Sequence, residues 1–359
     1  MLPPIPLEIF DFIVDHLHDD PTALKSCCLV SKSWVPRARR YLFAQVEFTS
    51  HRCPIQSWIN AFPDPSNSPG HHTRSLNLYD IKSTNAAGTI APTWVHHFSQ
   101  IEELTVANFM SRNLLPVSFV QLRGLSPTLK SLHIFHVSAR LSEFFDLICS
   151  FPLLENLSLH FITTWGDADR WYTPPTSPKL TGSLHLIDPS PLVTRELLAF
   201  PIGPRFSQIA VSCPVESAKL VADLISKCSD TLEYLTVGFD YPTPGLLDLS
   251  EAIKLKEMRF ESVGLDVRWV ITALRTAKSA NLQNIMIKIG SSRSTLVKTI
   301  GETLHREWED LDHLLDQLWT SRSIRPKVTY ELRRAANGLG ELVQSFLPKL
   351  ASKGVINGV

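Results

Sequence analysis

Short segments with apolar residues at alternate positions recur along most of the chain, and their spacing restricts the fold more than any other feature. Alternation of this kind is typical of a β-strand with one buried face. A period of about 20–29 residues indicates stacked strand-containing units that share one core. The first residues of successive pairs lie 23 to 28 positions apart, and the pairs are Leu76/Leu78, Leu104/Val106, Leu132/Ile134, Leu157/Leu159, Leu184/Leu186, Ile209/Val211, Leu235/Val237, Met258/Phe260 and Ile285/Ile287.

Several of these segments have a further apolar residue three positions upstream: Ile101, Leu129, Leu154, Leu232, Leu255 and Leu282. Between the strands, apolar residues at helical spacing predict helices over 141–149, 215–228 and 267–278. A doubly wound sheet is the alternative, but its strands are buried on both faces and have longer apolar runs. The sequence therefore favours an α/β fold in which residues 49–290 form an irregular repeat solenoid with a parallel sheet.

The first 48 residues have a different pattern. Apolar residues follow Pro6 at helical spacing and fall on one arc of a helix: Ile9, Phe10, Ile13, Val14 and Leu17. Asp20 before Pro21 predicts the N-cap of a second helix, and Ser31 that of a third. Three short helices bury too little surface to be stable alone, so we expect a partner on the first helix. Packing within the helical segment alone is the alternative.

The chain ends differently again. Residues 291–359 predict a helical cap: a helix over 294–321, a strand over 327–330 and a last helix over 341–350. A cap of this kind closes the open edge of a repeat array. Two stretches interrupt the repeats, a polar, turn-rich loop at 63–73 and a longer insert at 165–178 that contains Trp165, Trp171 and Tyr172.

Composition excludes several classes of function. The 35 basic residues balance the 35 acidic ones, so no net field favours nucleic acid or an anionic membrane. The cluster of Arg37, Arg39 and Arg40 is interpreted as the polar face of a helix. No apolar run approaches the roughly 20 residues that span a bilayer. The six scattered cysteines indicate reduced thiols and a cytoplasmic or nuclear protein.

No local motif predicts catalysis. The thirteen histidines include the pairs His71/His72 and His96/His97, whose side chains diverge, and no HExxH or CxxC spacing occurs. Phosphate-binding glycine loops and the GxSxG nucleophile motif are also missing from the sequence. We therefore expect a protein that is not an enzyme and has no metal or cofactor. An active site assembled from distant residues is the alternative.

Residues 5–43 resemble an F-box, the three-helix module that binds the Skp-family adaptor of cullin-RING (SCF) ubiquitin ligases. Its Leu-Pro-x-Glu element is matched by Ile5-Pro6-Leu7-Glu8, and its closing Val-Cys-x-x-Trp element by Val30, Ser31 and Trp34. The aliphatic positions between these elements are matched by Ile9, Ile13 and Leu17. The resemblance implies an adaptor-binding surface formed by Ile5, Pro6, Ile9, Ile13, Leu17, Val30 and Trp34.

The remaining chain resembles the degenerate leucine-rich repeats that often follow F-boxes in mushroom-forming fungi, and the segments Trp308–Leu311 and Leu347–Gly354 resemble their C-terminal tails. Leucine-rich repeats normally place Asn or Cys three residues after the last strand leucine, whereas this chain has Phe109, Val137, Ile162 and Asp240 there. The resemblance implies a substrate receptor for ubiquitin-dependent degradation. The alternative is a protein-interaction scaffold outside any ligase.

In such an array, the residues between the buried apolar pairs point to the concave surface. The prominent ones are aromatic or basic, as in many protein-recognition surfaces. The sequence therefore predicts a target-binding face formed by Tyr79, His133, Phe135, His160, His185, Tyr234 and Arg259. Coverage of this face by the insert or by the C-terminal tail is the alternative.

Overall fold

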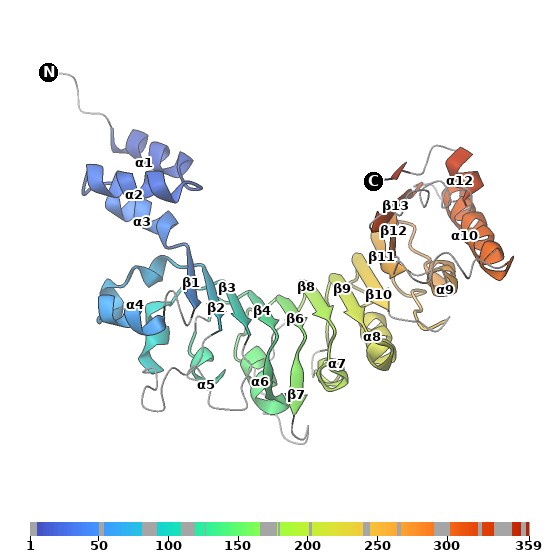
Figure 1. Cartoon of the computed structure of the whole chain (residues 1–359), viewed down its shortest axis with the longest axis horizontal. Helices are drawn as coiled ribbons and strands as arrows, with labels where there is room; N and C mark the ends of the chain where they lie inside the picture. Colours follow the sequence, from blue (N-terminus) through green and yellow to red (C-terminus); the bar gives the residue numbers. More distant parts are fainter. Residues whose placement is uncertain are drawn as a thin grey trace. The chain divides into compact units, whose positions relative to one another are not determined.

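The computed structural model describes residues 6–49, 54–80, 92–108, 119–125, 127–165, 178, 180–200, 203–239, 245–263, 267–290, 302–321, 325–333, 347–352 and 357–358 (Figure 1). The chain is a mixed α/β protein with a large parallel sheet. It divides into two compact units, residues 1–155 with 162–178 and residues 156–161 with 179–359.

The first unit begins with three helices, α1 (Leu7–His16), α2 (Pro21–Val30) and α3 (Val35–Leu42). Their shared core consists of Val14, Leu24, Cys27 and Ala38. As predicted, Asp20 caps α2: its Oδ1 accepts the backbone N–H groups of Thr22 and Ala23 at 3.0 Å. The predicted cap of α3 is wrong, because the Ser31 side chain instead bonds Ser33 within the turn, and α3 starts after Trp34.

Four parallel strands follow in the first unit: β1 (Gln45–Thr49), β2 (Ser75–Tyr79), β3 (Glu103–Ala107) and β4 (Ser131–Phe135). Strand β1 extends the series by one strand that the leucine spacing had not included. A separate parallel pair is formed by β5 (Ser138–Arg140) and β7 (Thr163–Trp165). The connections contain α4 (Ile55–Ala61), η1 (Pro65–Asn67), η2 (Pro69–His72), η3 (Pro92–His97), α5 (Phe119–Leu122) and α6 (Leu141–Cys149).

The stretch over 63–73 differs from the polar loop predicted for it. It forms the two 3₁₀ helices η1 and η2, and Ser68, Pro69, Gly70 and Thr73 are buried. The Ser68 hydroxyl accepts the Trp58 indole N–H at 3.2 Å, which satisfies one of these buried polar groups. Most of the insert at 165–178 lies outside the described residues.

The second unit continues the pattern with parallel strands β6 (Asn156–His160), β8 (Ser183–Ile187), β9 (Gln208–Cys213), β10 (Tyr234–Phe239), β11 (Glu257–Val263), β12 (Asn284–Gly290), β13 (Lys327–Arg333) and β14 (Asn357–Gly358). Within each unit the strand order follows the chain order, whereas a doubly wound sheet reverses it at a switch point. The helices are α7 (Pro191–Leu198), α8 (Val215–Lys227), α9 (Arg268–Thr276), α10 (Glu302–Ser321) and α12 (Pro348–Ser352).

The alternating apolar pairs form the core of both units. Both members of every pair in the sequence series are buried, and so are the upstream residues Ile101, Leu129, Leu154, Leu232, Leu255 and Leu282. Paired strands place equivalent residues side by side, as in the register Leu76↔Leu104↔Leu132 and the register Ile209↔Leu235↔Met258. This confirms the strand positions and facing that the spacing predicted.

The end of the second unit is anchored on α10. Trp308, Leu311 and Leu315 are buried on this helix, and Asp312 Oδ2 accepts the backbone N–H of Lys349 at 3.0 Å. The predicted strand over 327–330 is confirmed as β13, which pairs with β12 and so extends the sheet. Residues 291–301 and 334–346 of the predicted cap lie outside the described residues. Within the described part of the chain, no helix has both the length and the apolar character needed to cross a membrane.

Backbone hydrogen bonds link successive strands at their starts. One carbonyl oxygen just before a strand accepts two consecutive N–H groups from the next repeat. The Ala44 oxygen accepts Arg74 N–H at 2.8 Å and Ser75 N–H at 3.0 Å. The same double acceptance recurs at the carbonyls of Arg74, Glu102, Gly182, Ser207, Glu233 and Lys256. At these seven positions, one repeat therefore fixes the register of the next one.

The turns that follow the strands depend on residues with positive φ. Asp80, Asn108, His136, Phe161 and Asp188 each come directly after a strand, with φ between 49° and 60°. The N–H of Asn108 then donates to the Phe135 oxygen at 2.9 Å, and the N–H of Asp188 to the Ser212 oxygen at 2.8 Å. The backbone thus satisfies its own polar groups, and the next position is free to hold the buried residues Val137 and Ile162.

Substitutions at Asn108 test this turn geometry, because its side chain is exposed and its φ is 60°. A β-branched residue in the left-handed region costs about 1–2 kcal/mol, whereas glycine adopts it without strain. We expect Asn108→Val to lower the free energy of unfolding by about that amount and Asn108→Gly to leave it nearly unchanged. Urea unfolding of both variants measures the difference. Equal stability of the two would contradict the assigned turn.

Candidate functional site

Helix α1 has apolar residues on two faces rather than one. Val14 is buried, and Phe10 lies against Trp34 with ring centroids 5.1 Å apart. Ile9, Phe12 and Ile13, at i, i+3 and i+4, point away from this core and are exposed. The arc predicted from the sequence is therefore divided between an inner face and an outer face.

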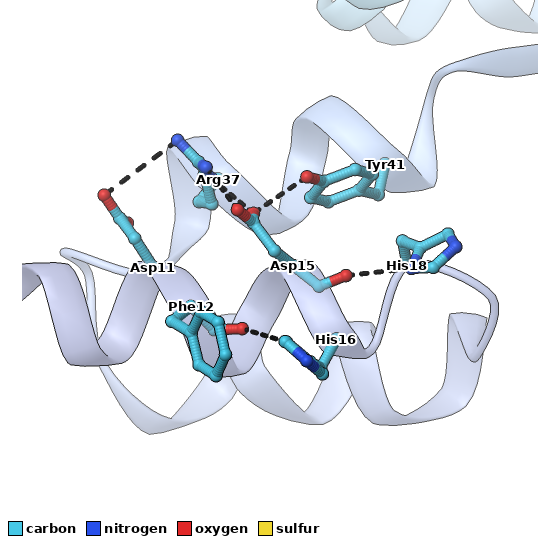
Figure 2. Close-up of polar contacts among 7 residues, drawn as sticks. All are labelled: Asp11, Phe12, Asp15, His16, His18, Arg37 and Tyr41. Atoms are coloured by element: carbon cyan, nitrogen blue, oxygen red, sulfur yellow. Dashed lines mark hydrogen bonds and ion pairs between the residues drawn. The ribbon is translucent and has the colours of Figure 1, made fainter.

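The inner side of α1 is fixed to α3 by a polar cluster (Figure 2). The Asp15 carboxylate accepts two bonds from Arg37, at 2.7 Å from Nε and 2.5 Å from Nη2, and a third from the Tyr41 hydroxyl at 2.8 Å. These bonds stabilise the charged carboxylate and lower the pKa of Asp15 to about 2. The bond from Arg37 makes the largest contribution, and the bond from Tyr41 the next largest. The same bond raises the pKa of Tyr41. The Asp15 carboxylate therefore joins α1 to α3.

Large exposed apolar side chains are concentrated in α1 and α2. Among the described residues nine such side chains are exposed, and five of them lie between positions 9 and 30. Their exposed fractions are 50% for Ile9, 62% for Phe12, 41% for Ile13, 89% for Leu29 and 68% for Val30. Scattered exposed apolar residues are normal, but a concentration of this kind marks an interaction site. We call these five residues the apolar surface.

The residues predicted to bind an adaptor fall into three groups. Ile9, Ile13 and Val30 belong to the apolar surface, and Pro6 is also exposed. Leu17 and Trp34 are only partly exposed and pack against the helical core. Ile5 lies outside the described residues. Sequence analysis missed Phe12 and Leu29, although Phe12 could have been found from its i, i+3 spacing to Ile9.

The second predicted surface is the polar face of the strands, formed by the side chains that alternate with the buried pairs. In the first unit it contains Tyr79, His133 and Phe135, all partly exposed. His133 Nε2 lies 3.4 Å from Glu103 Oε1, and its ring stacks on Phe135 with centroids 6.3 Å apart. Burial lowers the pKa of His133, while Glu103 opposes this effect.

In the second unit, His160 and His185 form a pair on adjacent strands. His160 Nε2 lies within hydrogen-bond distance of two groups, His185 Nδ1 at 3.2 Å and the Ser158 hydroxyl at 3.0 Å. Tyr234 is exposed, with the Lys256 ammonium 5.9 Å from its ring centroid. Arg259 lies 3.8 Å from Glu257, and its buried Nε has no hydrogen-bond partner among the described residues. Within the second unit, the polar face therefore offers aromatic, basic and hydrogen-bonding groups on strands of one sheet.

The described residues contain no group of three or more His, Cys, Asp or Glu side chains arranged to hold a metal ion. Two of the thiols are also unsuited to nucleophilic chemistry, because burial raises the pKa of Cys149 to about 12 and that of Cys228 to about 11. Comparison with known proteins adds no assignment: no protein-family model matches the chain, and no curated protein matches it.

The Asp15 cluster makes a pH-dependent contribution to the stability of the three helices. The pKa of Asp15 falls from 3.8 to about 2 in the folded chain, so its contribution is complete above about pH 4 and is lost as the pH falls towards 2. We expect Asp15→Asn to weaken hydrogen-exchange protection of residues 7–42 at pH 7. The difference from the wild type should shrink between about pH 4 and pH 2.

Asp19→Asn is the matched control, because Asp19 is exposed and this substitution removes the same negative charge. Hydrogen exchange followed by mass spectrometry measures both variants over the pH series, with the intrinsic exchange rate corrected at each pH. A loss of protection in Asp15→Asn that is equal at pH 7 and pH 2.5, or no loss at all, would show that the ionised cluster does not hold α1 to α3.

Proposed function

We propose that this chain is the substrate-recognition subunit of an SCF ubiquitin ligase. In this proposal α1–α3 are an F-box that binds a Skp-family adaptor, and the strand units are degenerate leucine-rich repeats that bind a target protein. The observation that carries the proposal is the apolar surface, which lies within the segment that resembles an F-box. The ubiquitin-transfer chemistry belongs to partner enzymes, so the chain itself needs no catalytic group. In this proposal the protein acts in the cytoplasm, the nucleus or both.

The energetics of the apolar surface favour a bound partner. Complete burial of an Ile, Leu or Phe side chain contributes about 1.5–3 kcal/mol relative to its exposure. The inner faces of the helices already fill the core around Val14, Leu24 and Ala38, so the outer residues are not needed to hold the helices together. Coverage by an adaptor gives these residues a role that self-packing does not.

The polar face supports target binding in the same proposal. Tyr and Arg side chains are enriched among the residues that dominate protein interfaces. Tyr234 is exposed, and the Arg259 side chain is 37% exposed. His133 and Phe135 add contact groups in the first unit, and His160 and His185 add them on two neighbouring strands of the second unit. We propose that the target contacts this face.

Adaptor binding is tested with Ile13→Asp. Ile13 is 41% exposed, so the substitution does not place a charge in the helical core. In the complex it buries an unpaired carboxylate, and we expect affinity for a Skp-family adaptor to fall by at least about thirtyfold, or about 2 kcal/mol. Phe12→Ala and Leu29→Ala should each weaken binding as well. Size-exclusion co-elution and titration calorimetry with the purified adaptor measure the effect.

Ile253→Asp provides the matched control, because Ile253 is 61% exposed but lies far along the chain from the helices. Its adaptor affinity should equal that of the wild type. If the wild-type chain does not bind the adaptor, the scaffold alternative replaces the ligase proposal. If it binds and Ile13→Asp binds equally well, the contact surface has been assigned to the wrong face of α1.

Target binding is tested on proteins that co-purify with the chain from its native cell and are then produced in pure form. We expect Tyr234→Ala and Phe135→Ala each to weaken binding of the target by about thirtyfold, because truncating an aromatic anchor costs about 2 kcal/mol or more. A triple variant of His133, His160 and His185 to Ala should also weaken it. Lys219→Ala, on the exposed side of α8, is the control. If the polar-face variants bind the target as well as this control does, the target-binding surface is not the polar face.

A further inference from the structure

A cavity of about 620 Å³ lies where α3 meets the first strand units. It is lined by Arg40, Tyr41, Ala44, His71, His72, Arg74 and Gln100, none of which carries a negative charge at neutral pH. Neither surface proposed above includes any of these residues. The volume is within the usual range of about 300–1,000 Å³ for small-ligand sites.

Backbone contacts hold the walls of this cavity in place. The carbonyl oxygen of Ala44 accepts the N–H groups of Arg74 and Ser75, which connects the end of α3 to the start of β2. His71 and His72 lie on η2, where His71 Nδ1 bonds the Ser68 carbonyl oxygen. Gly70 of η2 packs so closely on the His97 carbonyl that a Cβ atom would collide with it. The basic side chains thus come from α3, from η2 and from Arg74 just before β2, three parts of the first unit that are fixed to one another.

The positive charge in the cavity is only partly balanced. Among the described residues, Arg40 forms no ion pair with a carboxylate. Arg74 Nη1 lies 3.2 Å from Glu102 Oε1, but the same carboxylate also lies 3.2 Å from the Lys130 ammonium. Asp15, on α1, is held by Arg37 and Tyr41. Of the two guanidinium groups that line the cavity, only that of Arg74 therefore has an ion-pair partner among the described residues, and it shares this partner with Lys130.

His72 lies in the same positive field. The rings of His71 and His72 lie 4.0 Å apart. Burial lowers the pKa of His72, and the positive charges of His71, Arg40, Arg39 and Arg74 lower it further. An anion in the cavity would reverse this electrostatic effect, so His72 can report on occupancy.

We propose that this cavity binds a phosphomonoester dianion. Guanidinium groups match phosphate oxygens with paired N–H donors, and charge-assisted bonds of this kind are about twice as strong as neutral ones. The histidines add donors when protonated, and the two arginines on separate elements suit a dianion better than a single carboxylate. The phosphate group can belong to a phosphorylated peptide side chain or to a small phosphorylated metabolite, since both present the same chemistry.

The test uses the full chain with three probes: inorganic phosphate, O-phosphoserine and a phosphoserine peptide. Serine and the unphosphorylated peptide are the controls for the last two probes. We expect O-phosphoserine to bind and serine not to bind in titration calorimetry. Arg40→Gln and Arg74→Gln should each weaken binding by about tenfold or more, because each removes a charged hydrogen bond. In nuclear magnetic resonance titrations, the pKa of His72 should rise when the probe is bound.

Arg39→Gln is the matched control, because Arg39 is the exposed neighbour of Arg40 on α3 but does not line the cavity. It should retain wild-type affinity within about twofold. Tighter binding of the peptide than of O-phosphoserine identifies a phosphopeptide as the source, and equal binding identifies a small molecule. The proposal is overturned if no phosphorylated probe binds, or if Arg39→Gln loses as much affinity as Arg40→Gln. Adaptor binding is measured separately, so either proposal can fail without the other.

Discussion

The fold depends on one backbone constraint: before seven of the described strands, a single carbonyl oxygen accepts two N–H groups from the following repeat. The oxygens of Ala44, Glu102 and Ser207 show the same arrangement in different parts of the chain. Because this bond fixes the register, each strand places its apolar pair beside the pair of its neighbour. Core packing then needs only apolar residues of suitable size at two positions per strand, and the rest of each repeat can vary in length and sequence.

The turn after each strand shows how that freedom is used. A residue in the left-handed region, such as Asn108 or Asp188, directs its own N–H to the next strand. A side chain that bonds the turn is then unnecessary, and apolar residues such as Val137 can take the following position and add to the core. The irregular repeats therefore still satisfy the backbone N–H groups of Asp80, Asn108, Phe161 and Asp188 in these turns, as a protein interior requires.

Sequence reasoning located the strands and the main helices because alternation and helical spacing are local patterns. It did not find β1, whose pair Val46/Phe48 precedes Leu76/Leu78 by 30 positions, just beyond the 23 to 28 positions of the other intervals. Ser31 has the residue type of a helix cap, but its hydroxyl bonds Ser33, and residue type alone does not decide between the two. The face of a helix that is buried depends on its neighbours. For that reason the sequence did not predict that Phe12 and Leu29 are exposed. It also did not predict the cavity lined by Arg40 and His72, because these residues are distant in the sequence and meet only in the folded chain.

The central claim is that α1 and α2 hold a protein adaptor through their outer apolar residues while the strands remain available to a target. Hydrogen exchange of the full chain, with and without a purified Skp-family adaptor, tests this most directly. The account predicts slower exchange in peptides that cover residues 7–17 and 24–31, and unchanged exchange in β8, β9 and β10. Protection confined to the strands, or no protection at saturating adaptor, would contradict it.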